Sequence, residues 1–167
     1  MEKYIDFDGV IFNTEDLLFD DNYYKAKLDS NFDKMKYVQD LDWYNLIKKS
    51  EEINDAISIL KELKNKVKIL TKVNSLENEA VAKVKILREL GVTSDIILVP
   101  FYLKKTDIVD AYENVLVDDT VHNLDDWYNN GGIPIFFNKD DKDIDGWFKE
   151  NTKYKKIKTL EYIKELD

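Results

Sequence analysis

Two carboxylates near the start of the chain, Asp6 and Asp8, are separated by one residue and followed by Gly9. Because the side chains of a strand alternate between its faces, this spacing places both acids on one face. If the apolar residues before them form a strand of an open α/β sheet, both acids stand at its carboxyl end, where such sheets bind ligands. Glycine lets the backbone turn sharply and come close to an anion. The segment therefore predicts a site for a hard cation and a phosphate.

A second acidic pair, Asp118 and Asp119, directly follows the apolar residues 115–117. Adjacent carboxylates repel each other, and a bound cation relieves that repulsion. Hard oxygen ligands that leave room for water suit Mg²⁺. The pair therefore predicts a site for a hard cation.

Two weaker motifs lie between the acidic pairs. Thr71 follows a strand expected at residues 67–70, and Lys104 and Lys105 precede Thr106. A threonine at a strand end is ordinary, and lysines are common in a chain with 35% charged residues. These two motifs are informative through their order along the chain.

In this order, the four motifs resemble those of the haloacid dehalogenase-like (HAD) phosphohydrolase superfamily. The resemblance covers nearly the whole chain, from Tyr4 to about Phe137. It implies that Asp6 is the catalytic nucleophile, which attacks phosphorus and forms an aspartyl-phosphate. It implies that Asp8 is the general acid and base, which protonates the leaving oxygen and later deprotonates the attacking water.

The resemblance also implies the phosphate-binding residues. Thr71 would bind phosphate oxygens through its hydroxyl, and Lys105 would balance charge in the transition state. Lys104 competes with Lys105 for that role, although a Lys-Thr pair at a helix start resembles the family pattern better. Gly9 would let the backbone approach the phosphate.

The resemblance implies that the cofactor is Mg²⁺, held by four residues of the two acidic motifs. Asp6 would contribute its carboxylate and Asp8 its backbone carbonyl. Of Asp118 and Asp119, we expect one direct and one outer-shell ligand, with Asp119 the direct one.

Within the superfamily, residues 5–11 and 116–119 and a small cap are similar to the cytosolic 5'(3')-deoxyribonucleotidase-like group. That similarity implies hydrolysis of nucleoside 5′-monophosphates. The chain departs from the common first motif at Asn13, and Arg88 is its single arginine. Two alternatives stay open: a phosphatase for another small phosphomonoester such as a sugar phosphate, and a HAD-fold protein that binds a ligand without turnover.

The apolar pattern alternates between short strand-like runs and amphipathic helices, which predicts an α/β fold with a Rossmann-like parallel sheet flanked by helices. We expect one helix capped by Ser50, and another that begins at about Ser75, buries Leu76 and stops at Gly91. The expected strands lie at residues 4–7, 67–70, 96–99, 115–117 and 133–137.

Residues 14–49 fit this alternation badly, and we expect them to form a small helical cap inserted after the first strand. The HAD-like core would then comprise residues 1–13 and 50–167. The cap segment is rich in aromatic rings, which either form the cap's own core or stack on a flat group such as a nucleobase. They are Phe19, Tyr23, Tyr24, Phe32, Tyr37, Trp43 and Tyr44.

The composition of the chain limits the classes of molecule that we expect it to bind. The 167 residues carry a net charge of −9, which argues against binding to nucleic acid polymers or anionic membranes. There are no cysteines, no run approaches the length of a membrane span, and no signal-peptide pattern precedes the first strand, so we expect a cytoplasmic protein. The expected partner is a small phosphorylated metabolite, and the aromatic cap could equally form a homodimer interface.

Two further features are expected to have no catalytic part. His122, the single histidine, lies close to the second acidic pair, but the mechanism does not require it. Residues 141–146 match the first half of a calcium-binding loop, yet Thr152 stands where the bidentate glutamate would be. We expect a solvated acidic turn there.

Overall fold

The computed structural model describes residues 1–140 and 153–166, and its centre is a sheet of six parallel strands. The strand order β3-β2-β1-β4-β5-β6 confirms the predicted α/β fold with a parallel sheet flanked by helices. All five expected strand regions are present, with bounds shifted by a few residues, and β6 adds a sixth. The strands are β1 (Lys3–Ile5), β2 (Lys68–Val73), β3 (Asp95–Pro100), β4 (Val115–Asp118), β5 (Ile133–Phe137) and β6 (Lys155–Ile157).

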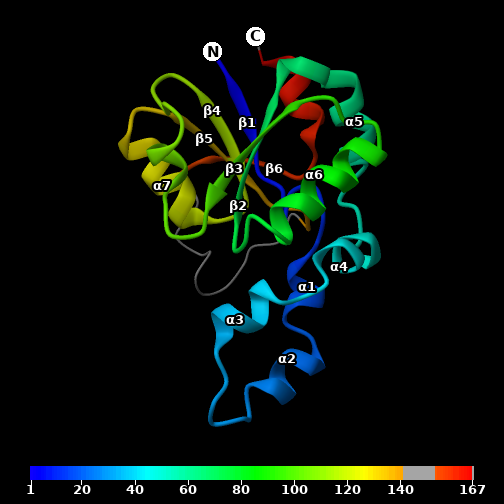
Figure 1. Ribbon diagram of the computed structural model, residues 1–167. Helices are drawn as coiled ribbons and strands as arrows, with labels where there is room; N and C mark the ends of the chain where they lie inside the picture. The colour runs from blue at the N-terminus through cyan, green and yellow to red at the C-terminus, as the bar shows by residue number, and fades with distance from the viewer. Residues whose placement is uncertain (141–152, 167) are drawn as a thin grey trace.

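Apolar side chains cover both faces of the sheet because neighbouring residues of a strand point to opposite sides. In β4, Val115 and Val117 join one buried cluster and Leu116 joins the other. Helices α5 (Ala56–Leu63) and α6 (Glu79–Glu89) pack on the first cluster, and α7 (Val121–Asn129) packs on the second (Figure 1). A 3-10 helix at Leu160–Glu165 closes the first face. The sheet is therefore buried on both of its faces.

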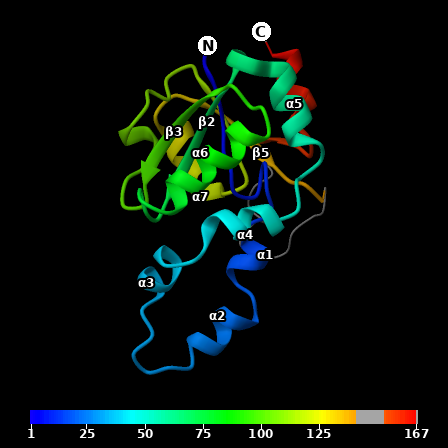
Figure 2. The ribbon, with the colours of Figure 1, turned by 45° about the vertical axis from the view of Figure 1, so that its right-hand side comes forward.

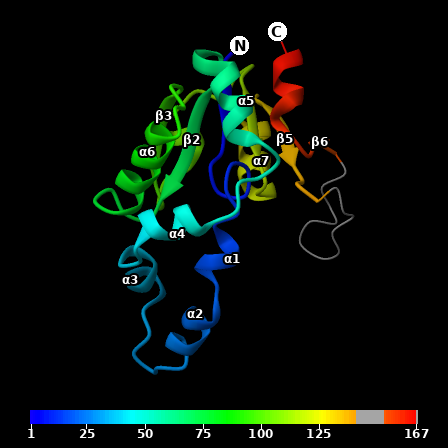
Figure 3. The ribbon, with the colours of Figure 1, turned by 90° about the vertical axis from the view of Figure 1, so that its right-hand side faces the viewer.

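Four short helices lie between β1 and α5, where the cap was expected. Helices α2 and α3 project away from the sheet as a separate lobe, whereas α4 packs against α6 (Figures 2 and 3). This lobe lies at the end of the molecule opposite the two termini (Figure 1). The helices are α1 (Glu15–Leu18), α2 (Asp21–Ala26), α3 (Lys34–Gln39) and α4 (Trp43–Lys49).

The rings of the cap segment pack mainly on each other. The Tyr23 ring meets those of Phe19, Phe32 and Tyr37 edge-on, with centroids 5.0, 5.7 and 5.6 Å apart. Trp43 is buried, and its indole N–H donates to the carbonyl of Val38 at 2.8 Å. These contacts favour a small aromatic core for the cap over stacking on a substrate.

The start of α5 differs from the prediction. Ser50 does not cap it, because Ser50 ends α4, where its hydroxyl donates to the carbonyl of Leu46. Helix α5 begins only at Ala56, after Asn54 and Asp55 turn the chain in the left-handed region with φ of 45° and 58°. Ser50 therefore marks the end of α4 rather than the start of α5.

Helix α6 also begins later than predicted. It starts at Glu79, so Leu76 lies before the helix and is exposed rather than buried. The prediction of Leu76 as a core residue is wrong, and two charged residues of α6, Glu79 and Lys83, are buried instead. The predicted stop at Gly91 is confirmed, because the helix ends at Glu89, Leu90 is its C-cap, and Gly91 follows Leu90 with φ +83°.

None of the helices in residues 1–140 and 153–166 is both long and apolar enough to cross a membrane. The calcium-loop-like residues 141–146 lie outside the described residues.

Candidate active site

The two acidic motifs meet where the chain connectivity of the sheet reverses, between β1 and β4. Strand β1 ends at Ile5, and the N–H of the next residue, Asp6, donates to the carbonyl of Val117 in β4 at 2.9 Å. Asp118 is the last residue of β4. Both acids thus stand at the carboxyl ends of neighbouring strands, at the switch point where open α/β sheets bind ligands.

Three carboxylates converge there. Oxygens of Asp6, Asp118 and Asp119 all lie within 4.8 Å of one another. Asp6 is 6% exposed and Asp118 is fully buried. A compact set of hard oxygen ligands fits Mg²⁺, so these residues fit the metal that the sequence predicts.

A buried lysine joins two of these acids. Lys105 Nζ lies 2.8 Å from Asp6 Oδ1 and 2.6 Å from Asp118 Oδ2. Its neighbour Lys104 turns outward, with a side chain that is 58% exposed and paired with Asp126 at 2.9 Å. Of the two lysines considered for phosphate binding, the fold therefore brings Lys105 to the acids and leaves Lys104 at the surface.

The negative charge of the three carboxylates exceeds what the single positive charge of Lys105 can neutralise. Burial raises the pKa of Asp6 to about 7, helped by the charges of Asp118 and Asp8 and opposed by Lys105. Burial also raises the pKa of Asp119 well above its usual value, and the charges of Asp118 and Asp6 add to the effect. Since a divalent cation would favour the ionised form of each group, the electrostatics of the site also fit a metal.

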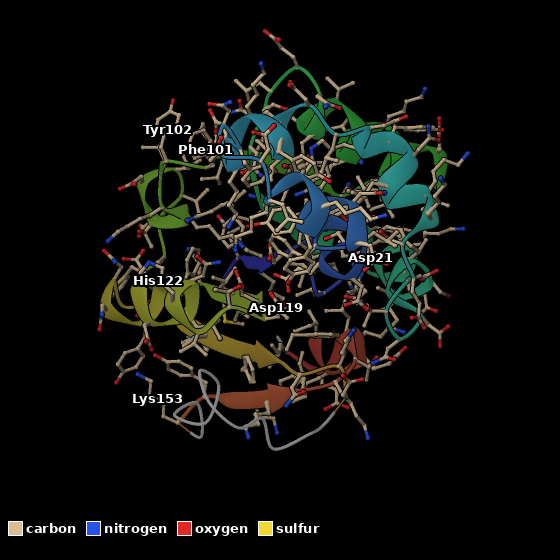
Figure 4. All side chains as sticks on the ribbon, turned by 90° about the horizontal axis from the view of Figure 1, so that it is seen from below. Asp21, Phe101, Tyr102, Asp119, His122 and Lys153 are labelled. Carbon is tan, nitrogen blue, oxygen red and sulfur yellow. The ribbon has the colours of Figure 1, made fainter. Side chains whose placement is uncertain are left out.

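The two acids of the second motif have different surroundings. Asp118 accepts hydrogen bonds from the Thr120 N–H at 2.8 Å and from Asn123 Nδ2 at 3.0 Å, besides that from Lys105. Asp119 instead lines a cavity on the cap-facing side (Figure 4). Which of the two acids is the direct metal ligand stays a prediction, with Asp119 the expected one.

Gly9 is required for Asp119 to reach its place. The backbone at Gly9 has φ +74°, and a Cβ atom there would lie 1.9 Å from Asp119 Oδ2. The Gly9 N–H donates to the carbonyl of Phe12 at 2.9 Å, so it is engaged within the loop. The structure thus gives Gly9 a role in admitting Asp119, and its predicted role toward phosphate stays a prediction.

Asp8 lies apart from the three carboxylates, in a second polar cluster. Its Oδ1 accepts from the Thr14 hydroxyl at 2.6 Å, and its Oδ2 accepts from Lys83 Nζ at 2.6 Å. Lys83 is fully buried on α6 and also contacts Glu79 Oε2 at 2.8 Å and Thr71 Oγ1 at 3.0 Å. Both oxygens of Asp8 are therefore held by hydrogen-bond donors.

Thr71 and Lys83 are where the sequence reasoning and the structure differ most. Thr71 lies inside β2 rather than at its end, is fully buried, and does not line the cavity, so its predicted phosphate contact stays a prediction. Lys83 was missed, since a lysine within a helical pattern suggests a solvated face. Its spacing of four residues from Glu79, on the face that carries Leu87, was the available signal.

The cavity in front of Asp6 has a volume of about 310 Å³ and polar walls. His122, expected to have no catalytic part, is exposed on the first turn of α7 and lines this cavity (Figure 4). None of the seven cap aromatics belongs to its lining. The lining residues are Asp6, Asp8, Glu15, Lys72, Lys105, Asp119, Thr120, His122 and Asn123.

Solved structures of similar fold are HAD-type hydrolases. A HAD phosphatase from Thermococcus onnurineus aligns over 98% of this chain and 96% of its own, with 16% identity and a TM-score of 0.60. A HAD hydrolase of family IA from Entamoeba histolytica aligns over 100% and 96%, with 15% identity and a TM-score of 0.61. A magnesium-bound HAD-type hydrolase from Bacillus subtilis aligns over 98% and 96%, with 14% identity and a TM-score of 0.60.

No family model matches the chain, and no curated protein matches it. At these identities the structural similarity defines the fold: a HAD-like α/β sheet with a helical insertion after the first strand.

Proposed function

We propose that this protein is a Mg²⁺-dependent phosphomonoester hydrolase that works through an aspartyl-phosphate on Asp6. The observation that carries the proposal is the meeting of Asp6, the acidic pair Asp118 and Asp119, and the buried Lys105 at one cavity that Asp8 also lines. Each group required for the two chemical steps is present. The HAD-type hydrolases of similar fold support the same reaction class.

In the first step, a carboxylate oxygen of Asp6 attacks phosphorus while the bond from phosphorus to the leaving oxygen breaks. Asp8 transfers its proton to that oxygen, so the alcohol leaves neutral. Lys105, fixed between Asp6 and Asp118, offsets the negative charge of the phosphoryl group as it moves. The product is an acyl phosphate on Asp6.

In the second step, water attacks the phosphorus and the bond between Asp6 and phosphorus breaks. Asp8 takes a proton from this water, which restores both side chains and frees inorganic phosphate. Asp6, Asp119 and the carbonyl of Asp8 would hold Mg²⁺, with Asp118 in its outer shell. When bound, the ion supplies neutralising charge and orients the phosphate.

For the substrate, we propose a small phosphorylated metabolite, with nucleoside 5′-monophosphates as the first class to test. The similarity to the deoxyribonucleotidase group supports this choice. One observation favours the alternative, a sugar phosphate. The cavity walls include the polar side chains of Glu15, His122 and Asn123, which suit an alcohol rich in hydroxyl groups, and no cap ring stands there to stack on a base.

The test is phosphate release from a panel of nucleoside monophosphates and sugar phosphates, with Mg²⁺ and with EDTA. Magnesium-dependent release concentrated on nucleotides would support the nucleotidase proposal, and release spread over sugar phosphates would replace it while keeping the chemistry. A folded protein that releases no phosphate from any ester would overturn the hydrolase proposal in favour of a HAD-fold binding protein.

A further inference from the structure

Lys83 is a buried cation that does not line the active-site cavity itself but contacts Asp8, which does. Its ammonium group donates to Asp8 Oδ2 at 2.6 Å and contacts Glu79 Oε2 at 2.8 Å. It also donates to Thr71 Oγ1 and to the carbonyl of Lys72, both at 3.0 Å. A buried ion pair seldom stabilises a fold more than apolar side chains of the same size would. Packing alone therefore does not account for a lysine at this position.

The surroundings hold the ammonium group in place. The rings of Phe7 and Trp43 lie beside Nζ, with centroids 5.0 and 6.0 Å away. Helix α6 belongs to the sheet-covering layer, and Lys83 is fully buried in it. Lys83 thus contacts Asp8 from the layer of helices that covers the sheet.

The two oxygens of Asp8 have partners of different chemistry. Lys83 carries only donors, so the oxygen that it contacts, Oδ2, has to act as an acceptor. Thr14 contacts Oδ1 through a hydroxyl, which can donate to an ionised oxygen and accept from a protonated one. A proton on Asp8 therefore fits on Oδ1 and does not fit on Oδ2.

We propose that Lys83 is a positioning residue for the acid and base of this site. By holding Oδ2 of Asp8, it makes Oδ1 the oxygen that gives a proton to the leaving alcohol and takes one from the attacking water. The inference rests on the proposed hydrolase function. The proton lost from Oδ1 in the first step is the proton regained there in the second, so neither Lys83 nor Thr14 changes its charge.

The first test compares leaving groups in the Lys83→Met variant. Under single-turnover conditions, release of an alkyl alcohol from its phosphate ester needs a proton from Asp8, whereas release of 2,4-dinitrophenolate does not. We expect Lys83→Met to slow the alkyl ester about 30- to 100-fold and the dinitrophenyl ester at most about threefold, because a misplaced proton donor affects only the leaving group that needs it. An equal loss on both esters would contradict a positioning role.

The second test asks whether Lys83 acts through Asp8. In an Asp8→Asn background there is no carboxylic acid to position, so adding Lys83→Met should change the rate by at most about twofold. If the double variant is slower than Asp8→Asn by the full factor seen in the wild-type background, Lys83 acts through the fold alone and the inference is wrong.

Controls separate folding from chemistry. Lys83→Met leaves Glu79 buried without its cation, so the Glu79→Gln/Lys83→Met variant is measured beside it; removing both charges leaves no unpaired charge buried on α6. If this variant folds and regains the wild-type rate on the alkyl ester, the role of Lys83 is structural. Lys85→Met, on the exposed side of α6, should leave both rates unchanged. A folded wild type inactive on every ester would overturn the proposed function, and with it this inference.

Discussion

Two buried lysines each join two carboxylates in this molecule, and they do so from different elements. Lys105, which opens a 3-10 helix after β3, joins Asp6 and Asp118. Lys83, on α6, joins Asp8 and Glu79. Both ammonium groups are almost completely removed from solvent.

The two regions differ in how far their charges are balanced by the protein itself. Around Lys105 a third carboxylate, Asp119, belongs to the group, and burial and its neighbours raise its pKa well above the usual value. Around Lys83 the hydroxyls of Thr14 and Thr71 complete the hydrogen bonds without adding charge. The first region therefore lacks positive charge, and a bound metal would supply the charge that both the carboxylates and a phosphate need. The second can hold a side chain in place without a ligand.

The largest effect on turnover is expected from a change of Asp6, the residue of the first region that forms the bond to phosphorus. Asp6→Asn should keep the fold and lower turnover by at least about 10⁴-fold, because an amide cannot replace the attacking carboxylate. Phosphate release and trapping of the phosphorylated protein measure this. Asp95→Asn, at the exposed start of β3, is the matched control and should behave as wild type. Unchanged activity in Asp6→Asn would remove Asp6 as the nucleophile.

The next effect distinguishes the adjacent lysines. Lys105→Met should lower turnover about 10²- to 10³-fold, because it removes the fixed cation beside Asp6 and Asp118. Lys104→Met should change turnover at most about twofold, since its side chain is exposed and pairs with Asp126. Steady-state rates of the two variants decide between them, and a larger loss in Lys104→Met would reverse the assignment.

Much of the first region could be predicted from the sequence. Short apolar runs followed by acids predict where β1 and β4 end. Parallel strands bring such carboxyl ends to one edge of the sheet. The same reasoning favoured Lys105 as the phosphate-binding lysine and kept Lys104 as an alternative. The local sequence does not indicate which of two adjacent lysines turns inward. In the structure Lys104 pairs with Asp126, 22 residues away, and Lys105 lies beside the acids, whereas phosphate binding by Lys105 stays a prediction.

The second region could not be predicted in the same way. Its contacts join Asp8 to Lys83 and Thr71 to Lys83, so they depend on how α6 packs over β1 and β2. The start of α6 was predicted too early, so Leu76 was counted in the buried face of the helix and Glu79 was not. A helix start moved by four residues leaves nearly the same apolar pattern, and only tertiary packing fixes where the helix begins.

A third prediction tests how the two acidic motifs meet. Gly9→Ala would place a methyl group where Asp119 Oδ2 now lies, so the Mg²⁺ concentration for half-maximal activity should rise about 10-fold or more. Gly91→Ala is the control, because it has a similar positive φ but its Cβ would meet only the Lys61 side chain. Activity measured over a Mg²⁺ titration separates the two. An equal shift in both variants would point to general backbone strain.

The smallest expected effect tests the charge imbalance itself, through pH and Mg²⁺. The pKa of Asp6 is raised to about 7 in the folded chain, by burial first, whereas an aspartate in an unfolded chain titrates near about 3.9. Its contribution to stability is thus complete below about pH 3.9 and is lost as the pH rises through about 7. Because Mg²⁺ binds the ionised carboxylates, its stabilising effect should grow over the same range.

At one fixed Mg²⁺ concentration, about 100 times the dissociation constant at pH 8, the thermal midpoint should rise about 5–10 °C at pH 8 and clearly less at pH 5. Thermal unfolding with Mg²⁺ and with EDTA measures both. Asp119→Asn should abolish the difference, while Glu79→Gln should keep it, because Glu79 belongs to the cluster around Lys83. A Mg²⁺ shift independent of pH, or one lost in Glu79→Gln, would mean that the two lysine regions do not differ in their need for a cation.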